Sequence, residues 1–130
     1  MSASWSDDGT PKPNGTAIPN VTLFTTGWDN PTFYTSLIGK GRKDTYLIVE
    51  HLGTTETGRA AQLAVAAGNG GKDDWFLPSY GEAIGMVPTG SWYWTSSQYN
   101  NSSAWITQGV VYERSRAKSD TANVRAIRAF

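Results

Sequence analysis

The sequence predicts a single α+β domain in which short helices precede a group of strands. Helix signals concentrate in the middle of the chain, and strand-like runs follow Gly90. The composition agrees, because 14 glycines and 12% aromatic residues are typical of short strands joined by many turns. With 130 residues, 38% of them hydrophobic, the chain is long enough to bury a core without disulfides.

Two helices are expected in the middle of the chain. The first begins at Asp44, an N-capping residue type, and ends before Gly53. Its apolar residues Ile48 and Leu52 lie four positions apart and therefore on one face. The second helix is the segment 59–67, which is rich in Ala and Leu.

Two shorter elements are expected next. The apolar run Trp75–Leu77 has the length of a buried strand. Ser79 and Glu82 have the spacing of a capping box, in which each side chain satisfies a backbone amide at the start of a helix. This third helix is short, because it has to stop before Pro88.

The last third of the chain is expected to be β structure, with a polar loop at Gln98–Ser103 and a tight turn at Gln108-Gly109. The last of its segments does not alternate cleanly, which is typical of a strand covered on both faces. An inward arginine there requires a carboxylate, for which Asp73 and Asp74 are the candidates. The candidate strands are Trp92–Ser96, Ala104–Thr107, Val110–Arg114 and Val124–Phe130.

Residues 1–37 are expected to differ from the rest. About the first 36 residues hold four of the six prolines, and proline fixes φ and removes a hydrogen-bond donor. We predict an extended N-terminal segment here, either a linker or an ordered edge of the fold, with Val21–Phe24 as its one plausible strand. Residues 38–130 then form the main domain.

Residue types that carry catalysis or bind metals are scarce. The absence of cysteine excludes a disulfide framework and thiolate metal sites. The one histidine, His51, has no second ligand of its kind, so a surface or packing role is expected. No serine has the glycine spacing of a nucleophile elbow, and the carboxylates are scattered. We therefore expect no enzymatic activity and no cofactor, with calcium at Asp73-Asp74 as the metal alternative.

The overall charge argues against two classes of partner. Eleven basic and eleven acidic residues cancel, so no whole-molecule field attracts nucleic acid or an anionic membrane. No apolar run reaches the roughly 18 residues of a membrane-spanning helix. Residues 1–6 lack the charged-then-apolar order of a signal peptide.

The segment 113–128 is locally basic, with five cations and two carboxylates, a net charge of +3. One interpretation is a solvated hairpin with one or two structural arginines. The other is a basic rim beside Tyr99, Trp105 and Tyr112, in which rings stack on sugars and arginines bind sulfate or carboxylate groups. Such a surface would suit an acidic glycan or an acidic protein.

Four motifs in order resemble the C-terminal domain of the Lcl collagen-like adhesins and its bacterial and phage relatives. The resemblance covers about residues 38–130 and implies a C-type-lectin-like fold, with two main helices packed on a twisted antiparallel sheet and long irregular loops. It also implies adhesion to a cell-surface glycan or protein receptor, an extracellular place on a bacterial surface or phage virion, and a homotrimer. The motifs are Asp73–Ser79 with Glu82, Trp92–Tyr99, Ala104-Trp105 and Val124–Phe130.

The same residues are similar to the variable proteins of diversity-generating retroelements, which display a ligand face on this scaffold. Carried onto this sequence, the resemblance implies a non-enzymatic binding face. Its residues are Gln98, Tyr99, Asn100, Asn101, Ser102, Trp105, Thr107, Gln108, Tyr112, Arg114, Arg116 and Lys118.

A structural module that caps or trimerises a fibre is the alternative function, with the aromatic residues serving as core. Burial distinguishes the two: the structural role is favoured if Tyr99, Trp105 and Tyr112 are all inaccessible. Neither role involves a cofactor, nucleic acid or insertion into a membrane.

Overall fold

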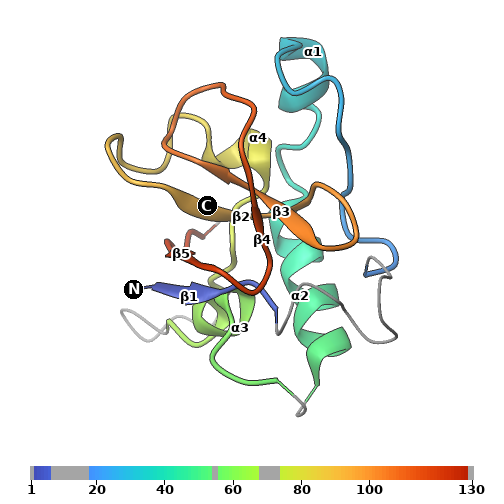
Figure 1. The fold of residues 1–130 in the computed structure, drawn as a ribbon, viewed down its shortest axis with the longest axis vertical. Coiled ribbons are helices and arrows are strands. Elements are labelled where there is room, and N and C mark those ends of the chain that lie inside the picture. Colours follow the sequence, from blue (N-terminus) through green and yellow to red (C-terminus); the bar gives the residue numbers. More distant parts are fainter. Residues whose placement is uncertain (1, 7–17, 54–55, 68–73, 129–130) are drawn as a thin grey trace.

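The fold was obtained as a computed structural model, which describes residues 2–6, 18–53, 56–67 and 74–128. Within these residues, four helices accompany one five-stranded sheet, and the predicted α+β class is confirmed (Figure 1). The helices are α1 (Pro31–Thr35), α2 (Gly41–Leu52), α3 (Ala60–Val65) and α4 (Tyr80–Ala83), and the strands are β1 (Ser2–Ser4), β2 (Tyr93–Gln98), β3 (Ser103–Thr107), β4 (Ser115–Ala117) and β5 (Thr121–Asn123).

The sheet is mixed, with the strand order β1-β5-β2-β3-β4. β1 pairs with β5, β2 with β3, and β3 with β4, all antiparallel, whereas β5 pairs with β2 in parallel at Asn123 and Tyr93. The prediction of an antiparallel sheet is therefore wrong for this pair. After β4 the chain continues through residues 118–120 to β5, which lies on the other side of β2 and runs parallel to it.

β2 carries an irregular register between Trp94 and Gln98. The side chains of the whole run Thr95–Gln98 are fully buried, although successive residues of a regular strand point to opposite faces. These polar groups are satisfied within the protein; the Ser96 hydroxyl, for example, donates to Asp44 Oδ2 at 3.0 Å. The centre of the sheet therefore contains buried polar side chains as well as hydrophobic ones.

α2 begins three residues earlier than predicted. Lys40 is its N-cap, and Asp44 lies in the first turn, almost completely buried. Because Lys40 is the N-cap, the Asp44 carboxylate does not cap the helix; it accepts hydrogen bonds from Thr22 N and the Ser96 hydroxyl. Burial raises its pKa above the usual range, against those hydrogen bonds. The predicted end is confirmed, because Gly53 follows the helix with a φ of +55°.

The predicted capping box at Ser79 and Glu82 is confirmed at the start of α4. Glu82 does more than a capping box requires, since its carboxylate also accepts from the backbone N–H groups of Gly39 and Gly41. The close approach around α4 needs a glycine at position 81, where a Cβ would lie 1.9 Å from the carbonyl oxygen of a residue in α1. α4 thereby fixes the start of α2 and the position of α1.

The predicted strands are only partly confirmed. β2 and β3 overlap the predicted segments Trp92–Ser96 and Ala104–Thr107, but 110–114 contains no strand, and β4 follows it at 115–117. In 124–128 only Ile127 pairs, in an antiparallel bridge with Phe76. The two segments differ in burial, since Val110 is 45% exposed and Val124 is buried in the main hydrophobic cluster.

The expected arginine–carboxylate pair is present. Arg128 donates to both carboxylate oxygens of Asp74, with its Nε 2.6 Å from Oδ1 and its Nη2 3.0 Å from Oδ2. Hydrogen bonding to Arg128 lowers the pKa of Asp74. Asp73, the other candidate, lies outside the described residues, as do residues 129 and 130. The pair joins the segment before α4 to the end of the described chain.

The described parts of residues 1–37 belong to the same core as the rest. β1 is an edge strand of the sheet, and Trp5, Ile18 and Val21 are buried in the main hydrophobic cluster. The sequence left open whether this segment is a linker or an ordered edge of the fold, and β1 is an ordered edge strand. The predicted strand Val21–Phe24 forms a single parallel bridge from Leu23 to Gln98.

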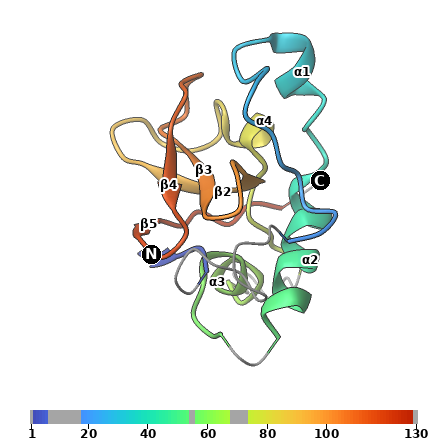
Figure 2. The ribbon, with the colours of Figure 1, turned by 45° about the vertical axis from the view of Figure 1, so that its right-hand side comes forward.

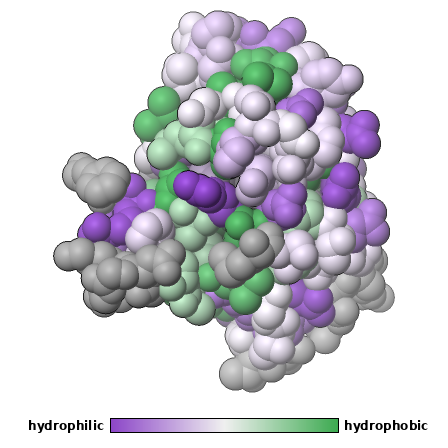
Figure 3. Space-filling model, turned by 90° about the vertical axis from the view of Figure 1, so that its left-hand side faces the viewer, coloured by the Kyte–Doolittle hydropathy of each residue, from purple (hydrophilic) through white to green (hydrophobic). Residues whose placement is uncertain are grey.

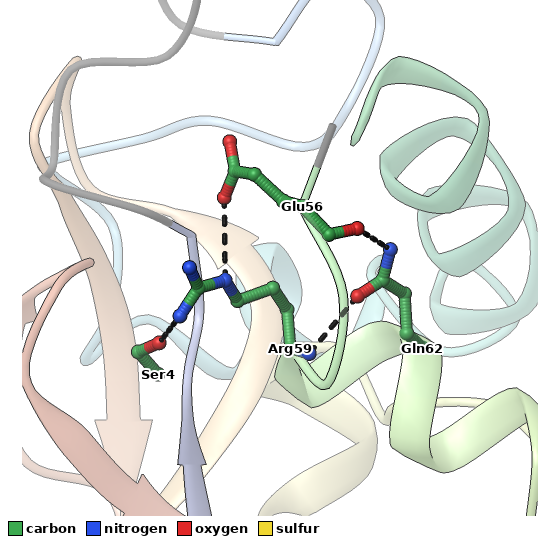
Figure 4. Close-up of polar contacts among 4 residues, drawn as sticks. All are labelled: Ser4, Glu56, Arg59 and Gln62. Carbon is green, nitrogen blue, oxygen red and sulfur yellow. Dashed lines mark hydrogen bonds and ion pairs between the residues drawn. The ribbon is translucent and has the colours of Figure 1, made fainter. Parts of the chain in front are cut away.

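A polar cluster attaches β1 to α3 (Figure 4). Arg59 Nη1 donates to the Ser4 hydroxyl, and Arg59 Nε lies 3.4 Å from the buried Glu56 carboxylate. Gln62 closes the arrangement by accepting from Arg59 N and donating to Glu56 O. Because Arg59 caps α3 while binding β1, the edge strand and the helix are held as one unit.

A second hydrophobic cluster lies at the opposite end of the molecule from α3. Its buried members are Phe24, Leu37, Tyr80 and Trp105, with α1 packed against them. In Figures 1 and 2, α1 lies at the top near α4, and α3 lies at the bottom near β1. In the described part of the chain, no helix has the length and apolar character needed to cross a membrane.

Candidate functional site

The predicted binding face is divided by the fold. Gln98, Trp105, Thr107 and Lys118 have fully buried side chains, so the expectation that they contact a ligand is wrong. The other eight predicted residues reach the surface: Tyr99, Gln108 and Arg116 are partly buried, and Asn100, Asn101, Ser102, Tyr112 and Arg114 are exposed.

Trp105 is a core residue. Its ring stacks on Phe24 with centroids 4.8 Å apart and packs against Tyr80 at 5.0 Å and Tyr99 at 5.1 Å. Its indole N–H donates to Phe24 O. The ring therefore stabilises the cluster under α1 and has no free face for a ligand.

Gln98 and Thr107 are buried because they bond the main chain. The Gln98 amide accepts from Ile18 N and donates to the carbonyl oxygens of Ile18 and Val21. The Thr107 hydroxyl donates to Val110 O and accepts from the amide of the turn that follows β3. The Gln98 side chain therefore fixes the chain around Ile18 and Val21, and the Thr107 side chain fixes the turn after β3.

Lys118 is a buried cation. Its Nζ donates to Gln98 Oε1 at 2.9 Å and lies 4.7 Å from the centroid of the Trp5 ring. Its carbonyl oxygen accepts from Trp5 N and Ser6 N, so the chain after β1 covers it. Burial lowers the pKa of Lys118 to about 8. This lysine belongs to the core.

The exposed residues of the predicted face occupy two ends of the sheet. Asn100–Ser102 lies in the turn between β2 and β3, where Asn100 Oδ1 accepts from Ser102 N and Ser103 N. Because β3 and β4 are antiparallel, Arg114 lies at the other end of the pair, and its carbonyl oxygen accepts from Ile106 N. The polar turn therefore lies at the opposite end of β3 from Arg114, while Arg116, which pairs with Ala104, lies between them.

The arginine end carries an aromatic and cationic cluster that we call the Trp92 patch, defined as Trp92, Tyr112, Arg114 and Arg116. The Trp92 and Tyr112 rings are 6.0 Å apart at an interplanar angle of 59°. Arg114 Cζ lies 5.4 Å from the Trp92 centroid, a cation–π distance. Tyr112 is 51% exposed, so the cluster faces solvent.

A shallow cavity of about 310 Å³ adjoins the Trp92 patch. Arg116 and Trp92 form part of its wall, and both are held in place: Arg116 Nη1 donates to Thr121 O at 2.7 Å, and Trp92 O accepts from Asn123 Nδ2 at 3.1 Å. The remaining lining residues, mostly small and polar, are Ser2, Ser91, Thr121, Ala122 and Asn123. The cavity thus combines a ring, a guanidinium group, hydroxyls and an amide.

Figure 3 shows the left-hand side of the view in Figure 1, toward which β1 and β5 extend. Strongly hydrophilic residues lie directly beside hydrophobic ones on this side, without a broad surface of either kind. Such a mosaic offers a ligand both stacking area and directed hydrogen bonds.

The sequence placed Trp92 in a strand and did not include it in the face. Trp92 and Trp94 are two residues apart and alike in their local sequence, yet Trp94 is fully buried and Trp92 only partly. No local signal separates them, because the difference arises from what packs over each ring. Only the structure shows that Trp92 lies just outside β2.

The described residues offer little for catalysis or metal binding. Groups of three or more His, Cys, Asp or Glu side chains that could hold a metal ion do not occur among them. Asp74 is bonded to Arg128, and Glu82 to three backbone amides. His51 is exposed near the end of α2. The Trp92 patch offers stacking, hydrogen bonding and charge.

Comparison of the chain with protein-family models, curated proteins and solved structures finds no match. The function is therefore argued from the geometry of the Trp92 patch.

Proposed function

We propose that this chain is a non-enzymatic receptor-binding domain that recognises an acidic surface glycan through the Trp92 patch and the adjoining cavity. The observation that carries the proposal is the stacking of Arg114 on Trp92 beside the exposed Tyr112. Aromatic faces pack against the C–H surface of a sugar, and a guanidinium group binds carboxylate or sulfate in a bidentate manner.

The two arginines are partly ordered before any ligand arrives. Arg114 rests on the Trp92 ring, and Arg116 is bonded to Thr121 O. A guanidinium group has five N–H donors, and Arg116 donates one of them to Thr121 O. Ordering a long side chain in advance reduces the entropy lost on binding. The patch is therefore suited to bind an anionic group without large rearrangement.

The proposal extends to the biological setting that the family resemblance suggests. A C-type-lectin-like, adhesin-like domain displayed on a bacterial surface or phage virion would meet such glycans outside the cell. A single shallow site gives modest affinity, and display in several copies multiplies it.

Binding to immobilised oligosaccharides tests the proposal. Sulfated, uronic-acid-containing and neutral glycans would be compared on one array, each with and without a chelator. We expect the protein to bind the sulfated or carboxylated members, and the double variant Tyr112→Ala/Arg114→Ala to lose at least about tenfold in affinity, since each lost contact contributes roughly 1 kcal/mol or more. Loss of glycan binding in the presence of the chelator would show that binding also requires calcium.

The matched control is Tyr46→Ala/Lys43→Ala, which removes an exposed tyrosine and an exposed cation from α2. It should bind like the unmodified protein. Equal loss in both double variants, or binding that is indifferent to both, would remove the Trp92 patch from the proposal. Binding confined to acidic proteins would redirect it to a protein receptor.

A structural fibre-capping or trimerisation module is the second candidate, favoured by the complete burial of Trp5, Trp94 and Trp105. These rings serve as core, as that function requires. Of the three rings whose burial distinguishes the two functions, Trp105 is buried, Tyr99 is partly buried and Tyr112 is exposed, and this favours the binding function. An array without any bound glycan, together with unaltered behaviour of the patch variants, would support the structural module.

A further inference from the structure

The Trp92 patch takes two of its members from 110–114, a segment that contains no strand. Both ends of this segment are bonded to β3: Val110 O accepts from a hydroxyl group of that strand at 3.2 Å, and Arg114 O accepts from its backbone at 3.1 Å. Tyr112 lies in the middle, between these two attachments. A further contact at the middle is therefore needed to keep the Tyr112 ring 6.0 Å from the Trp92 ring.

The hydroxyl group of Tyr80 supplies such a contact. It donates to Trp28 O at 3.1 Å, and it accepts a hydrogen bond from the main chain of Tyr112. A tyrosine hydroxyl has one hydrogen to donate, and the bond to Trp28 O uses it, so the oxygen acts as the acceptor toward Tyr112. Burial raises the pKa of Tyr80 to about 12, and the group therefore keeps its proton at neutral pH.

Tyr80 is itself held from several sides. Its side chain is fully buried, and its ring packs against Phe24 and Trp105 with centroids 5.6 and 5.0 Å away. Its backbone N–H donates to the Ser97 hydroxyl of β2 at 3.0 Å. A side chain whose position is fixed by packing and by hydrogen bonds can fix the segment that is bonded to it.

We propose that Tyr80 is the positioning residue of the Trp92 patch: its hydroxyl fixes the middle of 110–114 and keeps Tyr112 and Arg114 beside Trp92. The role is indirect, because the buried Tyr80 side chain has no surface for a ligand. The inference rests on the proposed function only for what the patch binds. Without the hydroxyl, the segment samples more conformations, and a ligand has to order it again at a cost in entropy.

Amide hydrogen exchange, resolved by residue with NMR, tests the contact without any ligand. The Tyr112 amide should be protected in the unmodified protein. Tyr80→Phe keeps the ring and removes the hydroxyl, so the Tyr112 amide should exchange about fivefold faster or more, the effect of one lost hydrogen bond. The Ile106 amide, which donates to Arg114 O at the end of the segment, should change much less.

Tyr34→Phe is the matched control. Tyr34 packs against the same hydrophobic cluster, and its ring centroid lies 6.4 Å from that of Tyr80. The variant removes a hydroxyl from this cluster and keeps the one that bonds Tyr112. Exchange of the Tyr112 amide should therefore match that of the unmodified protein.

Affinity for a heparin oligosaccharide, an acidic glycan with both sulfate and carboxylate groups, is the second readout. It should fall about threefold or more in Tyr80→Phe and stay unchanged in Tyr34→Phe. A role in overall stability alone would not produce this pattern, because both variants are compared under conditions in which they are fully folded.

Four results would overturn the proposal. The first is unaltered exchange of the Tyr112 amide in Tyr80→Phe, and the second is equal acceleration in both variants. The third is faster exchange with unchanged affinity for a glycan that the unmodified protein binds. The fourth is a Tyr112 amide that is unprotected in the unmodified protein, which decides the matter even if Tyr80→Phe does not fold.

Failure of the proposed function would look different. The unmodified protein would then bind no acidic glycan, while the exchange rates of the Tyr112 amide would still decide whether Tyr80 positions the segment 110–114.

Discussion

Two cation–aromatic pairs in this protein differ in depth and therefore in role. Lys118 lies 4.7 Å from the Trp5 ring, and Arg114 lies 5.4 Å from the Trp92 ring. Lys118 and Trp5 are 0% and 1% exposed, whereas Arg114 is exposed. Both cations come from one short segment, and the sequence predicted both as ligand contacts. The comparison teaches that burial decides whether such a pair holds the fold together or is available to a partner.

The difference has a local cause. The chain after β1 passes over Lys118, whose carbonyl oxygen accepts from Trp5 N and Ser6 N. Arg114 lies in 110–114, which has no strand, and its side chain is left at the surface. The following predictions test how far the two pairs differ, beginning with the largest effect.

Removing the buried ring should cost the most. Trp5→Ala deletes a side chain that is 1% exposed and whose indole N–H donates to Thr95 O at 2.9 Å. We expect the free energy of unfolding to fall by about 3–5 kcal/mol, as for other buried aromatic residues. Urea titration measures it. A loss below about 1 kcal/mol would show that Trp5 is not part of the core.

The buried cation should make stability depend on pH. The pKa of Lys118 is about 8 in the folded protein and about 10.5 unfolded, so between these values the unfolded chain holds the proton. The free energy of unfolding should therefore rise from pH 8 to pH 10, by roughly 2–3 kcal/mol. Burial raises the pKa of Tyr80 to about 12, so above pH 10 the unfolded chain loses this proton more readily than the folded protein and the free energy of unfolding falls. The effect of Lys118 is therefore measured at pH 10 and below.

Lys118→Met is the test of that assignment. The variant removes the titrating group and keeps an unbranched apolar side chain, so the rise between pH 8 and pH 10 should disappear and stability at pH 7 should increase. Chemical denaturation at several pH values measures both effects. The same rise in the Met variant would assign the titration to another group.

The two pairs should also differ in coupling energy. A double-mutant cycle on Arg114→Ala and Trp92→Leu should give about 0.5–1 kcal/mol, the range of exposed cation–π contacts. The cycle on Lys118→Met and Trp5→Leu should give about 2 kcal/mol, because both partners are desolvated. Thermal and urea unfolding of the four single and two double variants provide the values. Equal coupling in the two cycles would mean that depth does not separate the pairs.

The smallest effect is expected at the exposed ring. Tyr112→Phe keeps the ring that packs against Trp92 and removes only its hydroxyl, on a side chain that is 51% exposed. The free energy of unfolding should stay within about 0.5 kcal/mol. Glycan binding should also persist if stacking is the contribution of this ring, and it should fall if the hydroxyl bonds the ligand.

Local patterns predicted several elements correctly. The capping box at Ser79 and Glu82 and the end of α2 at Gly53 depend on residues a few positions apart. An arginine in a covered segment needs a carboxylate, so a pair with Asp73 or Asp74 was expected, and the structure shows it between Arg128 and Asp74. The α+β class followed in the same way, from the order of helical and strand-like segments.

The binding face was less predictable, because it depends on contacts between distant segments. Arg114, Arg116 and Lys118 alternate along the chain and would lie on one side of a regular strand. Lys118 lies in the core because the chain after β1 passes over it. The same applies to Gln98, whose amide bonds Ile18 and Val21, about 80 positions away.

The sequence by itself determined the α+β class, the end of α2 at Gly53 and the capping box of α4, since such features depend on neighbouring residues and local hydrogen bonds; α1 was not predicted, because it lies in the segment 1–37 that was expected to be extended. The tertiary structure alone decided the parallel pairing of β5 with β2, the burial of Trp105 and Lys118, and the exposure of Trp92. The physical reason is that burial measures how many atoms from distant parts of the chain surround a side chain, and no local pattern carries that information.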